Sequence, residues 1–181
     1  MVTANHAYRI ATILDQDSIH SVYWSAFAEG EREIISELAV NLLLEKTTPP
    51  IISLLAEAEG AVVGHVAFSP VTIDSNKNFQ GYILAPLGVK PDYQHRRIGS
   101  QLIESGMQQL SRLDVGILFV YGDPQYYSRF GFSTDHSNLF VPPYKLQYSF
   151  GWQLKQLKDC VLPTRPISLL CVQSLMKPEL W

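Results

Sequence analysis

The chain has 181 residues, of which 46% are hydrophobic and 17% are charged, and its formal net charge at pH 7 is -3. This profile is typical of a soluble globular protein with one core. A dedicated nucleic-acid binder needs a broad basic face, so the acidic balance argues against nucleic acid as a partner.

The sequence also lacks the patterns of a membrane or secreted protein. No apolar run approaches the roughly 20 residues that cross a bilayer, and the start Met-Val-Thr-Ala-Asn-His lacks the basic and apolar blocks of a signal peptide. Cys160 and Cys171 form no Cys-x-x-Cys pair, so we expect packing residues rather than a disulfide framework or a zinc site. We therefore expect a cytoplasmic protein with no membrane partner.

The first elements follow the order strand, helix, helix. Residues 8–13 are rich in strand formers. Asp15 and Asp17 then supply carboxylates that favour a helix start, and apolar residues recur at helical spacing over residues 19–27. The same spacing over residues 34–43 predicts a second amphipathic helix.

The middle of the chain reads as a hairpin and a long strand. Apolar runs at residues 52–58 and 61–68 flank the pair Glu59-Gly60, which favours a tight turn. A polar loop at residues 74–78 leads into a largely apolar strand over residues 80–89. Pro86 and Gly88 in this strand indicate a local irregularity or a close ligand approach.

A β-α-β crossover follows. One apolar stripe predicts a helix, and residues 116–121 predict a buried strand that is parallel to the previous one. The stripe consists of Leu102, Ile103, Gly106, Met107, Leu110 and Leu113. Asp123 and Pro124 then favour a short helix that ends at Gly131. Residues 167–172 are predicted as a final strand.

The most informative stretch covers residues 82–103 and reads as a strand, a basic loop and a helix start. A helix start exposes unpaired backbone N–H groups and carries partial positive charge, and Arg96 and Arg97 add full charges there. Gly99 removes a side chain where a phosphate would approach. The stretch predicts an anion site, while an ordinary connection with solvated arginines fits the same residues.

Two motifs resemble the GCN5-related N-acetyltransferases and, within them, the YhbS-like branch. Gln94-His95-Arg96-Arg97-Ile98-Gly99 is similar to the family loop Q/R-x-x-G-x-G/A, which holds the pyrophosphate of acetyl-CoA on backbone amides. Residues 122–132 resemble the branch block G-D-P-x-Y-Y-x-R-F-G-F. The order of the expected elements also agrees over roughly residues 7–135.

The resemblance implies an α/β (α+β) fold of the acyl-CoA N-acyltransferase type. Its central mixed, mostly antiparallel sheet would have about six to seven strands flanked by helices, with a parallel β-α-β crossover at the cofactor site. One N-acetyltransferase domain would cover residues 1–181, with C-terminal strands and loops in 136–181. A primary amine of a small molecule or protein would attack acetyl-CoA directly, without an acyl-enzyme or a metal.

The same resemblance implies the site residues. Leu87, Gly88 and Val89 would pair with the pantetheine arm as with an added strand. The pyrophosphate would lie on Gln94, His95, Arg96, Arg97, Ile98, Gly99 and Ser100. Tyr127 aligns with a tyrosine that protonates the coenzyme A thiolate in many members, and it is protonated at neutral pH. Tyr127 and Tyr126 also fit a role as rings that cap the core, which we favour for Tyr126.

The chain departs from the family pattern at Arg97, where a glycine is usual. The Cβ of Arg97 would make a positive-φ backbone cost about 1–2 kcal/mol. Either the backbone is ordinary there, or coenzyme binding is weakened, or the guanidinium contacts a phosphate directly. The tail at residues 175–181 also reads as shorter than in branch members, which continue into another strand.

Other functional groups are harder to assign. Glu29, Glu31 and Glu33 lie where the family places substrate-facing residues, but such a row is more often a solvated face, so no general base is identified. The histidines lack ligand spacing, so no metal is expected. The aromatic region at residues 140–152 and Trp181 could supply an apolar contact for a homodimer.

Two rival functions share the strand, basic loop and helix. A nucleotide-phosphate enzyme is disfavoured, because neither Gly-x-x-x-x-Gly-Lys-Ser/Thr nor Gly-x-Gly-x-x-Gly occurs in the chain. A non-catalytic acyl-CoA-binding or protein-interaction module with the same fold is compatible with the sequence, if Arg97 or the shorter tail abolished turnover.

Overall fold

The computed structural model describes residues 6–73 and 79–181, so the polar loop predicted at 74–78 and residues 1–5 lie outside the described residues. The described strands form a six-stranded sheet in the order β1-β2-β3-β4-β5-β7 and a two-stranded sheet of β6 and β8. The large sheet consists of β1 (Ala7–Ile10), β2 (Ile52–Ala58), β3 (Ala61–Val71), β4 (Gly81–Val89), β5 (Ile117–Tyr121) and β7 (Trp152–Gln156).

Pairing in the large sheet is mixed. The pairs β1–β2, β2–β3 and β5–β7 are antiparallel, whereas β4 and β5 are parallel. Glu59 and Gly60 join β2 to β3 with φ angles of 54° and 78°, which suits a tight hairpin turn. The predicted mixed sheet with a parallel crossover and the predicted hairpin are thus confirmed.

The described residues divide into two compact units. Unit 1 contains the described residues of Met1–Lys46, Pro50–Phe68 and Pro86–Gly106. Unit 2 contains those of Thr47–Pro49, Ser69–Ala85 and Met107–Trp181. The prediction of one domain over the whole chain stays a prediction. Among the described residues, no helix has the length and apolar character to cross a bilayer.

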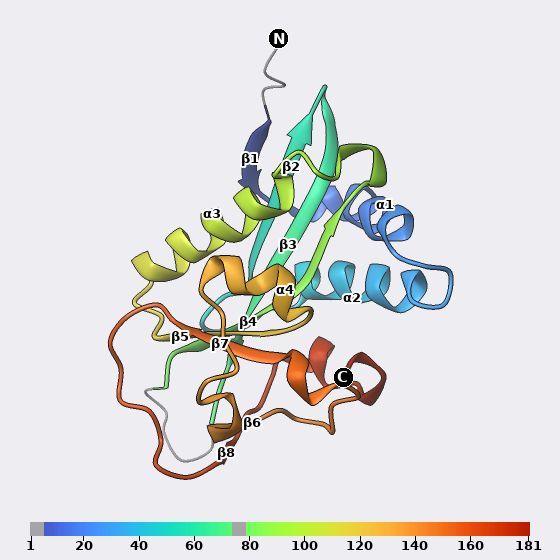
Figure 1. Ribbon diagram of the computed structural model, residues 1–181. Coiled ribbons are helices and arrows are strands. Elements are labelled where there is room, and N and C mark those ends of the chain that lie inside the picture. Colours follow the sequence, from blue (N-terminus) through green and yellow to red (C-terminus); the bar gives the residue numbers. More distant parts are fainter. Residues whose placement is uncertain (1–5, 74–78) are drawn as a thin grey trace. The chain divides into compact units, whose positions relative to one another are not determined.

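In unit 1, helices cover both faces of the strands. Helices α1 (Gln16–Ala26) and α2 (Arg32–Leu44) lie on one side, and the first part of α3 (Ile98–Arg112) lies on the other (Figure 1). Two glycines permit this close packing. A Cβ on Gly64 would lie 3.0 Å from Ile98 of α3, and one on Gly88 would lie 2.8 Å from the Tyr23 ring of α1.

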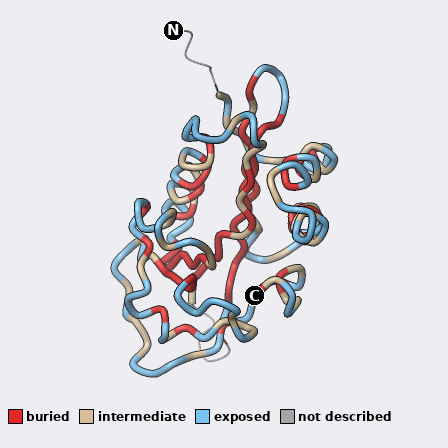
Figure 2. Tube along the Cα trace, turned by 45° about the vertical axis from the view of Figure 1, so that its right-hand side comes forward, coloured by how far each residue is buried: buried red, intermediate tan, exposed pale blue. Residues whose placement is uncertain are grey.

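The core of unit 1 follows the predicted apolar positions. Ile19, Val22 and Tyr23 of α1 and Ala39 of α2 are fully buried. Buried residues also run along β2 and β3 (Figure 2). Leu102, in the part of α3 that belongs to unit 1, is buried as predicted, and so is Leu110 in the part that belongs to unit 2. Helix α3 ends before Leu113, which is half exposed, so the prediction that Leu113 belongs to the stripe is wrong.

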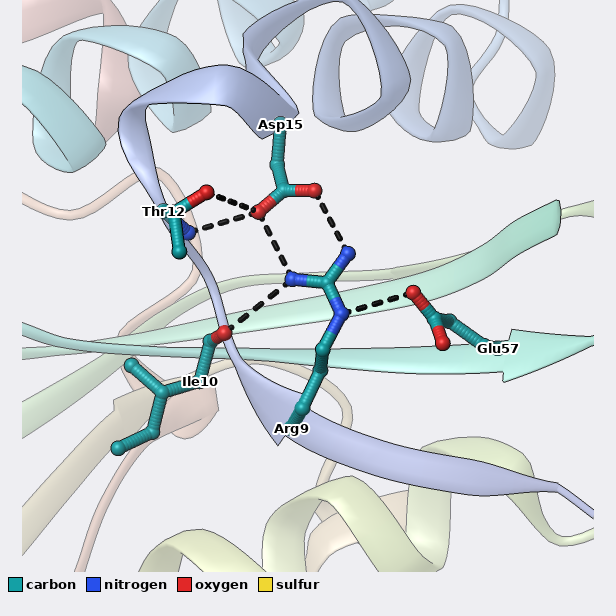
Figure 3. Close-up of polar contacts among 5 residues, drawn as sticks. All are labelled: Arg9, Ile10, Thr12, Asp15 and Glu57. Carbon is teal, nitrogen blue, oxygen red and sulfur yellow. Dashed lines mark hydrogen bonds and ion pairs between the residues drawn. The ribbon is translucent and has the colours of Figure 1, made fainter. Parts of the chain in front are cut away.

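The N-terminal segment differs from the prediction in two ways. The predicted strand at residues 8–13 ends at Ile10, and a 3-10 turn (Ile13–Asp15) follows it. The Asp15 carboxylate makes no capping hydrogen bond to α1. Instead it accepts hydrogen bonds from the Thr12 backbone N–H at 2.7 Å and from two Arg9 nitrogens at 2.8 and 2.7 Å (Figure 3). Because a guanidinium carries a full positive charge and a helix start only a partial one, the Asp15 carboxylate pairs with Arg9 rather than capping α1.

Unit 2 is built on β5, which pairs with the Gly81–Leu84 part of β4 and with β7. Phe119 of β5 stacks on Trp152 of β7 with ring centroids 5.3 Å apart. Trp152, Trp181 and Phe140 are all less than 10% exposed, so these three side chains are interior rather than available for the predicted homodimer contact. Tyr148 and Phe150 are the exposed aromatic residues of this region.

The tail corrects the prediction of a final strand at residues 167–172. Strand β8 covers only Ile167–Ser168 and pairs with β6 (Phe140–Val141) in the small sheet. The run is divided because Leu169 N–H bonds to the Val141 carbonyl, whereas Leu170 N–H bonds to the Thr72 carbonyl. The last strand of the large sheet is β7, which the sequence analysis did not identify.

Candidate active site

The end of β4 exposes one side of its backbone. Lys90 N–H donates to the Val63 carbonyl of β3 at 2.9 Å. Because peptide groups of successive strand residues alternate between the two edges, those of Leu87 and Val89 face away from β3. The pairing of β4 with β5 covers residues 81–84 and stops short of this segment. An extended ligand can therefore hydrogen-bond to β4 at residues 87–89.

The loop after β4 has an unusual backbone. A 3-10 turn (Pro91–Tyr93) comes first, and the Gln94 side-chain amide then donates to the Val89 carbonyl at 3.0 Å, which ties the loop to the strand. His95 and Arg97 have φ angles of 61° and 62°. Both adopt the left-handed conformation that favours glycine, at a cost of about 1–2 kcal/mol each. Arg97 thus keeps a glycine-like backbone, which rules out the ordinary backbone considered above.

The two arginines of the loop carry unneutralised charge. Arg96 and Arg97 are exposed, and no carboxylate of the described residues forms an ion pair with either. The Arg96 guanidinium lies 5.1 Å from the centroid of the Tyr93 ring. The loop therefore presents positive charge that the described protein groups leave available to an anion.

Helix α3 begins directly at this charge. Gln101 N–H donates to the Arg97 carbonyl, which opens the helical hydrogen bonding. Ile98 is 1% exposed and anchors the first turn in unit 1. The N–H groups of Ile98, Gly99 and Ser100 have no intrahelical acceptor, because the first turn of a helix offers none. A bound phosphate would satisfy them and the helix dipole together.

The second motif forms α4 (Pro124–Tyr127) in unit 2. Asp123 caps it, because the Asp123 carboxylate accepts from Gln125 N–H at 2.9 Å, and Pro124 occupies the first turn as predicted. A Cβ on Gly122 would lie 2.5 Å from the Tyr127 ring, so only glycine leaves room for that ring. Gly131, at φ 83°, ends the following 3-10 turn (Ser128–Phe130).

Tyr127 is half-buried and packs against two aromatic rings. Its ring makes edge contacts with Tyr126 and Phe132 at centroid distances of 5.0 and 5.8 Å. Burial raises the pKa of the Tyr127 phenol well above its usual value, and nearby Tyr126 and Asp123 add to this rise. Within the described part of the chain, the Tyr127 hydroxyl makes no hydrogen bond. The group is thus a neutral donor at neutral pH.

The predicted site residues do not all belong to one unit. The Leu87–Val89 segment and residues 94–100 lie in unit 1, whereas Tyr127 lies in unit 2. Glu29, Glu31 and Glu33 are exposed, as expected of a solvated face, and none is identified as a general base. Among the described residues, no cluster of His, Cys, Asp and Glu has the makeup of a metal site.

The sequence analysis missed a buried polar network below the end of β4. Tyr23, Ser53 and His65 come from α1, β2 and β3 and are joined by hydrogen bonds of 2.7 Å. The available signal was a histidine and a serine inside strands that are otherwise apolar. Buried polar side chains need partners, so their presence in such strands indicates a network.

Comparisons with known proteins agree with this geometry. The family model of the acetyltransferase (GNAT) domain matches residues 50–134. The uncharacterized N-acetyltransferase YjhQ of Escherichia coli (strain K12) is 31% identical over 161 residues, which cover 86% of this chain and 87% of YjhQ. The uncharacterized N-acetyltransferase YhbS of the same strain is 30% identical over 126 residues, with coverage of 68% and 71%.

Solved structures are similar along most of the chain. The crystal structure of Escherichia coli YhbS in complex with CoA has a TM-score of 0.80 at 24% identity and covers 96% of this chain and 93% of that one. A GNAT family acetyltransferase from Brucella melitensis in complex with acetyl-CoA has a TM-score of 0.66 at 27% identity, with coverage of 91% and 95%.

Proposed function

This chain belongs to the GNAT family and is an N-acetyltransferase, and we propose that it transfers acetyl from acetyl-CoA to a primary amine of a small molecule or protein by direct attack. Support comes from the named N-acetyltransferase relatives and from the related structures that hold CoA or acetyl-CoA. The observation that carries the proposal is the left-handed, doubly basic loop at the start of α3.

The residues present fit acetyl-CoA at two points. Leu87 and Val89 would bind the amide groups of the pantetheine arm as an added strand. Arg96, Arg97 and the first N–H groups of α3 would bind the pyrophosphate. Because the Arg97 guanidinium is exposed and has no carboxylate partner among the described residues, we propose that it contacts a phosphate directly.

Tyr127 is the proposed proton donor. Acetyl-CoA supplies the activated thioester when bound. The Tyr127 hydroxyl, kept neutral by its burial, would donate a hydrogen bond and then a proton to the departing sulfur, and it would regain a proton that the attacking amine releases. Tyr126 would keep a structural role. Its ring packs against Tyr127, and the centroid of this ring lies 4.3 Å from the Cζ atom of the Arg129 guanidinium.

A binding assay and a turnover assay together test the proposal. Acetyl-CoA at about 100 times its Kd should stabilise the protein by ~2.7 kcal/mol, or about 5–10 °C in Tm. Pantetheine, which lacks the pyrophosphate, is the matched control and should raise Tm much less. A panel of primary amines should then release free thiol from acetyl-CoA.

Each outcome has a distinct meaning. A rise in Tm without thiol release from any amine favours the non-catalytic acyl-CoA-binding module. Equal rises with acetyl-CoA and pantetheine would remove the loop from pyrophosphate binding. No rise in Tm and no thiol release would contradict the proposed function as a whole.

A further inference from the structure

Unit 1 contains a chain of buried polar side chains that ends on the backbone of β4. The Ser53 hydroxyl lies 2.7 Å from His65 Nε2, and His65 Nδ1 lies 2.7 Å from the Tyr23 hydroxyl. The Tyr23 hydroxyl in turn lies 3.0 Å from the Pro86 carbonyl and 3.1 Å from the His65 carbonyl. Tyr23 and His65 are fully buried, and Ser53 is 7% exposed.

The protons of this chain can be placed in one consistent order. Burial lowers the pKa of His65 far below its usual value, so the imidazole is neutral and has one donor and one acceptor nitrogen. The Tyr23 hydroxyl faces carbonyl oxygens, which only accept. Tyr23 therefore donates to a carbonyl, Nδ1–H of His65 donates to the Tyr23 oxygen, and the Ser53 hydroxyl donates to Nε2.

Tyr23 contacts β4 on both sides of Leu87. Pro86 has no N–H group, so β4 loses one ladder hydrogen bond at this residue. The Tyr23 hydroxyl supplies a donor to the Pro86 carbonyl, and its ring occupies the space that a Cβ on Gly88 would need. Hydroxyl and ring together hold the strand backbone just where Leu87 and Val89 turn their peptide groups away from β3.

We propose that Tyr23 is a positioning residue for acetyl-CoA: held by His65 and Ser53, it fixes the β4 backbone at Pro86 and Gly88 in the geometry that binds the pantetheine arm. Tyr23 touches no ligand itself and acts through the strand. The inference rests on the proposed function, because it assigns the arm to residues 87–89.

Replacement of Tyr23 by phenylalanine separates the hydroxyl from the ring. Tyr23→Phe keeps the ring against Gly88 and removes the hydrogen bond to Pro86. We expect the Kd for CoA, measured by calorimetry, to rise roughly five- to twentyfold, and kcat at saturating acetyl-CoA to change much less than KM. Amide hydrogen exchange in peptides that contain residues 87–89 should become faster.

Tyr144→Phe is the matched control. The Tyr144 hydroxyl donates to the Met176 carbonyl at 3.2 Å in unit 2, so the control removes the same kind of bond outside the unit that contains Pro86 and Gly88. Its Kd for CoA should stay within about twofold of wild type. A similar rise of Kd in both variants would show a general loss of stability rather than positioning and would overturn the inference.

Two milder variants keep the test informative if Tyr23→Phe fails to fold. Ser53→Ala removes the partner of His65 Nε2 and should raise the Kd less than Tyr23→Phe does. His65→Asn keeps a polar group near the Nδ1 position and should bind CoA more tightly than His65→Ala.

The wild-type protein separates the two possible failures. If it does not bind CoA, the proposed function fails. If it binds CoA while folded Tyr23→Phe and Ser53→Ala bind equally well, the positioning role is wrong and the proposed function stands.

Discussion

Arg9 and Arg97 belong to the same unit, yet their charges have opposite fates. The Arg9 guanidinium donates to both Asp15 oxygens, to Glu57 and to the Ile10 carbonyl (Figure 3). Arg97 is exposed, sits on a left-handed backbone and has no carboxylate partner among the described residues. A guanidinium whose hydrogen bonds are all accepted by protein groups ties secondary-structure elements together. A guanidinium without a carboxylate partner at a helix start is available to a ligand.

Tyr127→Phe gives the largest expected effect. Unlike the two arginines, Tyr127 is uncharged and is assigned to proton donation. We expect kcat to fall about 100-fold, with the KM for acetyl-CoA nearly unchanged, because the phenol is assigned to proton donation and not to binding. Steady-state kinetics measure both values. The matched control is Tyr126→Phe, which should retain most activity, and an unchanged kcat in Tyr127→Phe would remove Tyr127 from the proton-donor role.

Asp15→Asn tests the structural role of Arg9, whose guanidinium is paired with Asp15. The Asp15 side chain is 11% exposed and that of Arg9 is 38% exposed, so solvent screens part of the pair, and we expect a loss of about 1–3 kcal/mol in unfolding free energy. Urea unfolding measures this loss. The affinity for acetyl-CoA should be unchanged, and a drop in affinity without a drop in stability would contradict the structural role of Arg9.

The same pair predicts a pH dependence. Hydrogen bonds from Arg9 hold the pKa of Asp15 well below its usual range. The contribution is therefore fully present above the usual pKa range of aspartate and is lost as the pH falls below it. The difference in unfolding free energy between wild type and Asp15→Asn should shrink on acidification. A difference that grows instead would show that the ionised Asp15 carboxylate does not stabilise the folded protein.

Arg97→Gly tests whether the guanidinium of Arg97, which has no carboxylate partner among the described residues, binds the coenzyme. We expect the Kd for CoA to rise about tenfold, or ~1.4 kcal/mol, because a phosphate contact is lost, and the salt dependence of binding to weaken. Titrations at low and high salt measure both. Tighter binding would mean that the arginine hinders the coenzyme, and no change would mean that its guanidinium points to solvent.

His95→Gly should have the smallest effect. It removes the same left-handed strain as Arg97→Gly but leaves both arginines of the loop in place. We expect a gain in stability of less than about 1 kcal/mol, since glycine also adds disorder to the unfolded chain. Its effect on CoA affinity should be smaller than that of Arg97→Gly. Thermal unfolding and titration of the two variants side by side separate backbone strain from charge.

Local chemistry made much of this molecule predictable. Asp123, Pro124 and Gly131 start and end α4 through capping, a fixed φ and a left-handed φ, all of which depend on residue type. The hairpin at Glu59 and Gly60 follows for the same reason. Periodic apolar residues located α1, α2 and α3 because each helix buries one stripe.

Local sequence patterns did not predict which groups form hydrogen bonds with each other. Asp15 reads as a helix cap until Arg9, six residues earlier in the chain, is found to bind it. The run at residues 167–172 is apolar enough for one strand, but its hydrogen bonds go to two different segments. The left-handed backbone of Arg97 also contradicts the preference of its side chain.

The sequence by itself determined the family, the crossover and the residues of the basic loop, because motif spacing and periodicity are written along the chain. Only the tertiary structure decided which arginine is neutralised and which is available, and that Tyr23, Ser53 and His65 meet under β4. Those outcomes depend on burial and on hydrogen bonds that local patterns do not specify, such as those from Arg9 to Glu57 and from Tyr23 to His65, which join residues far apart in sequence.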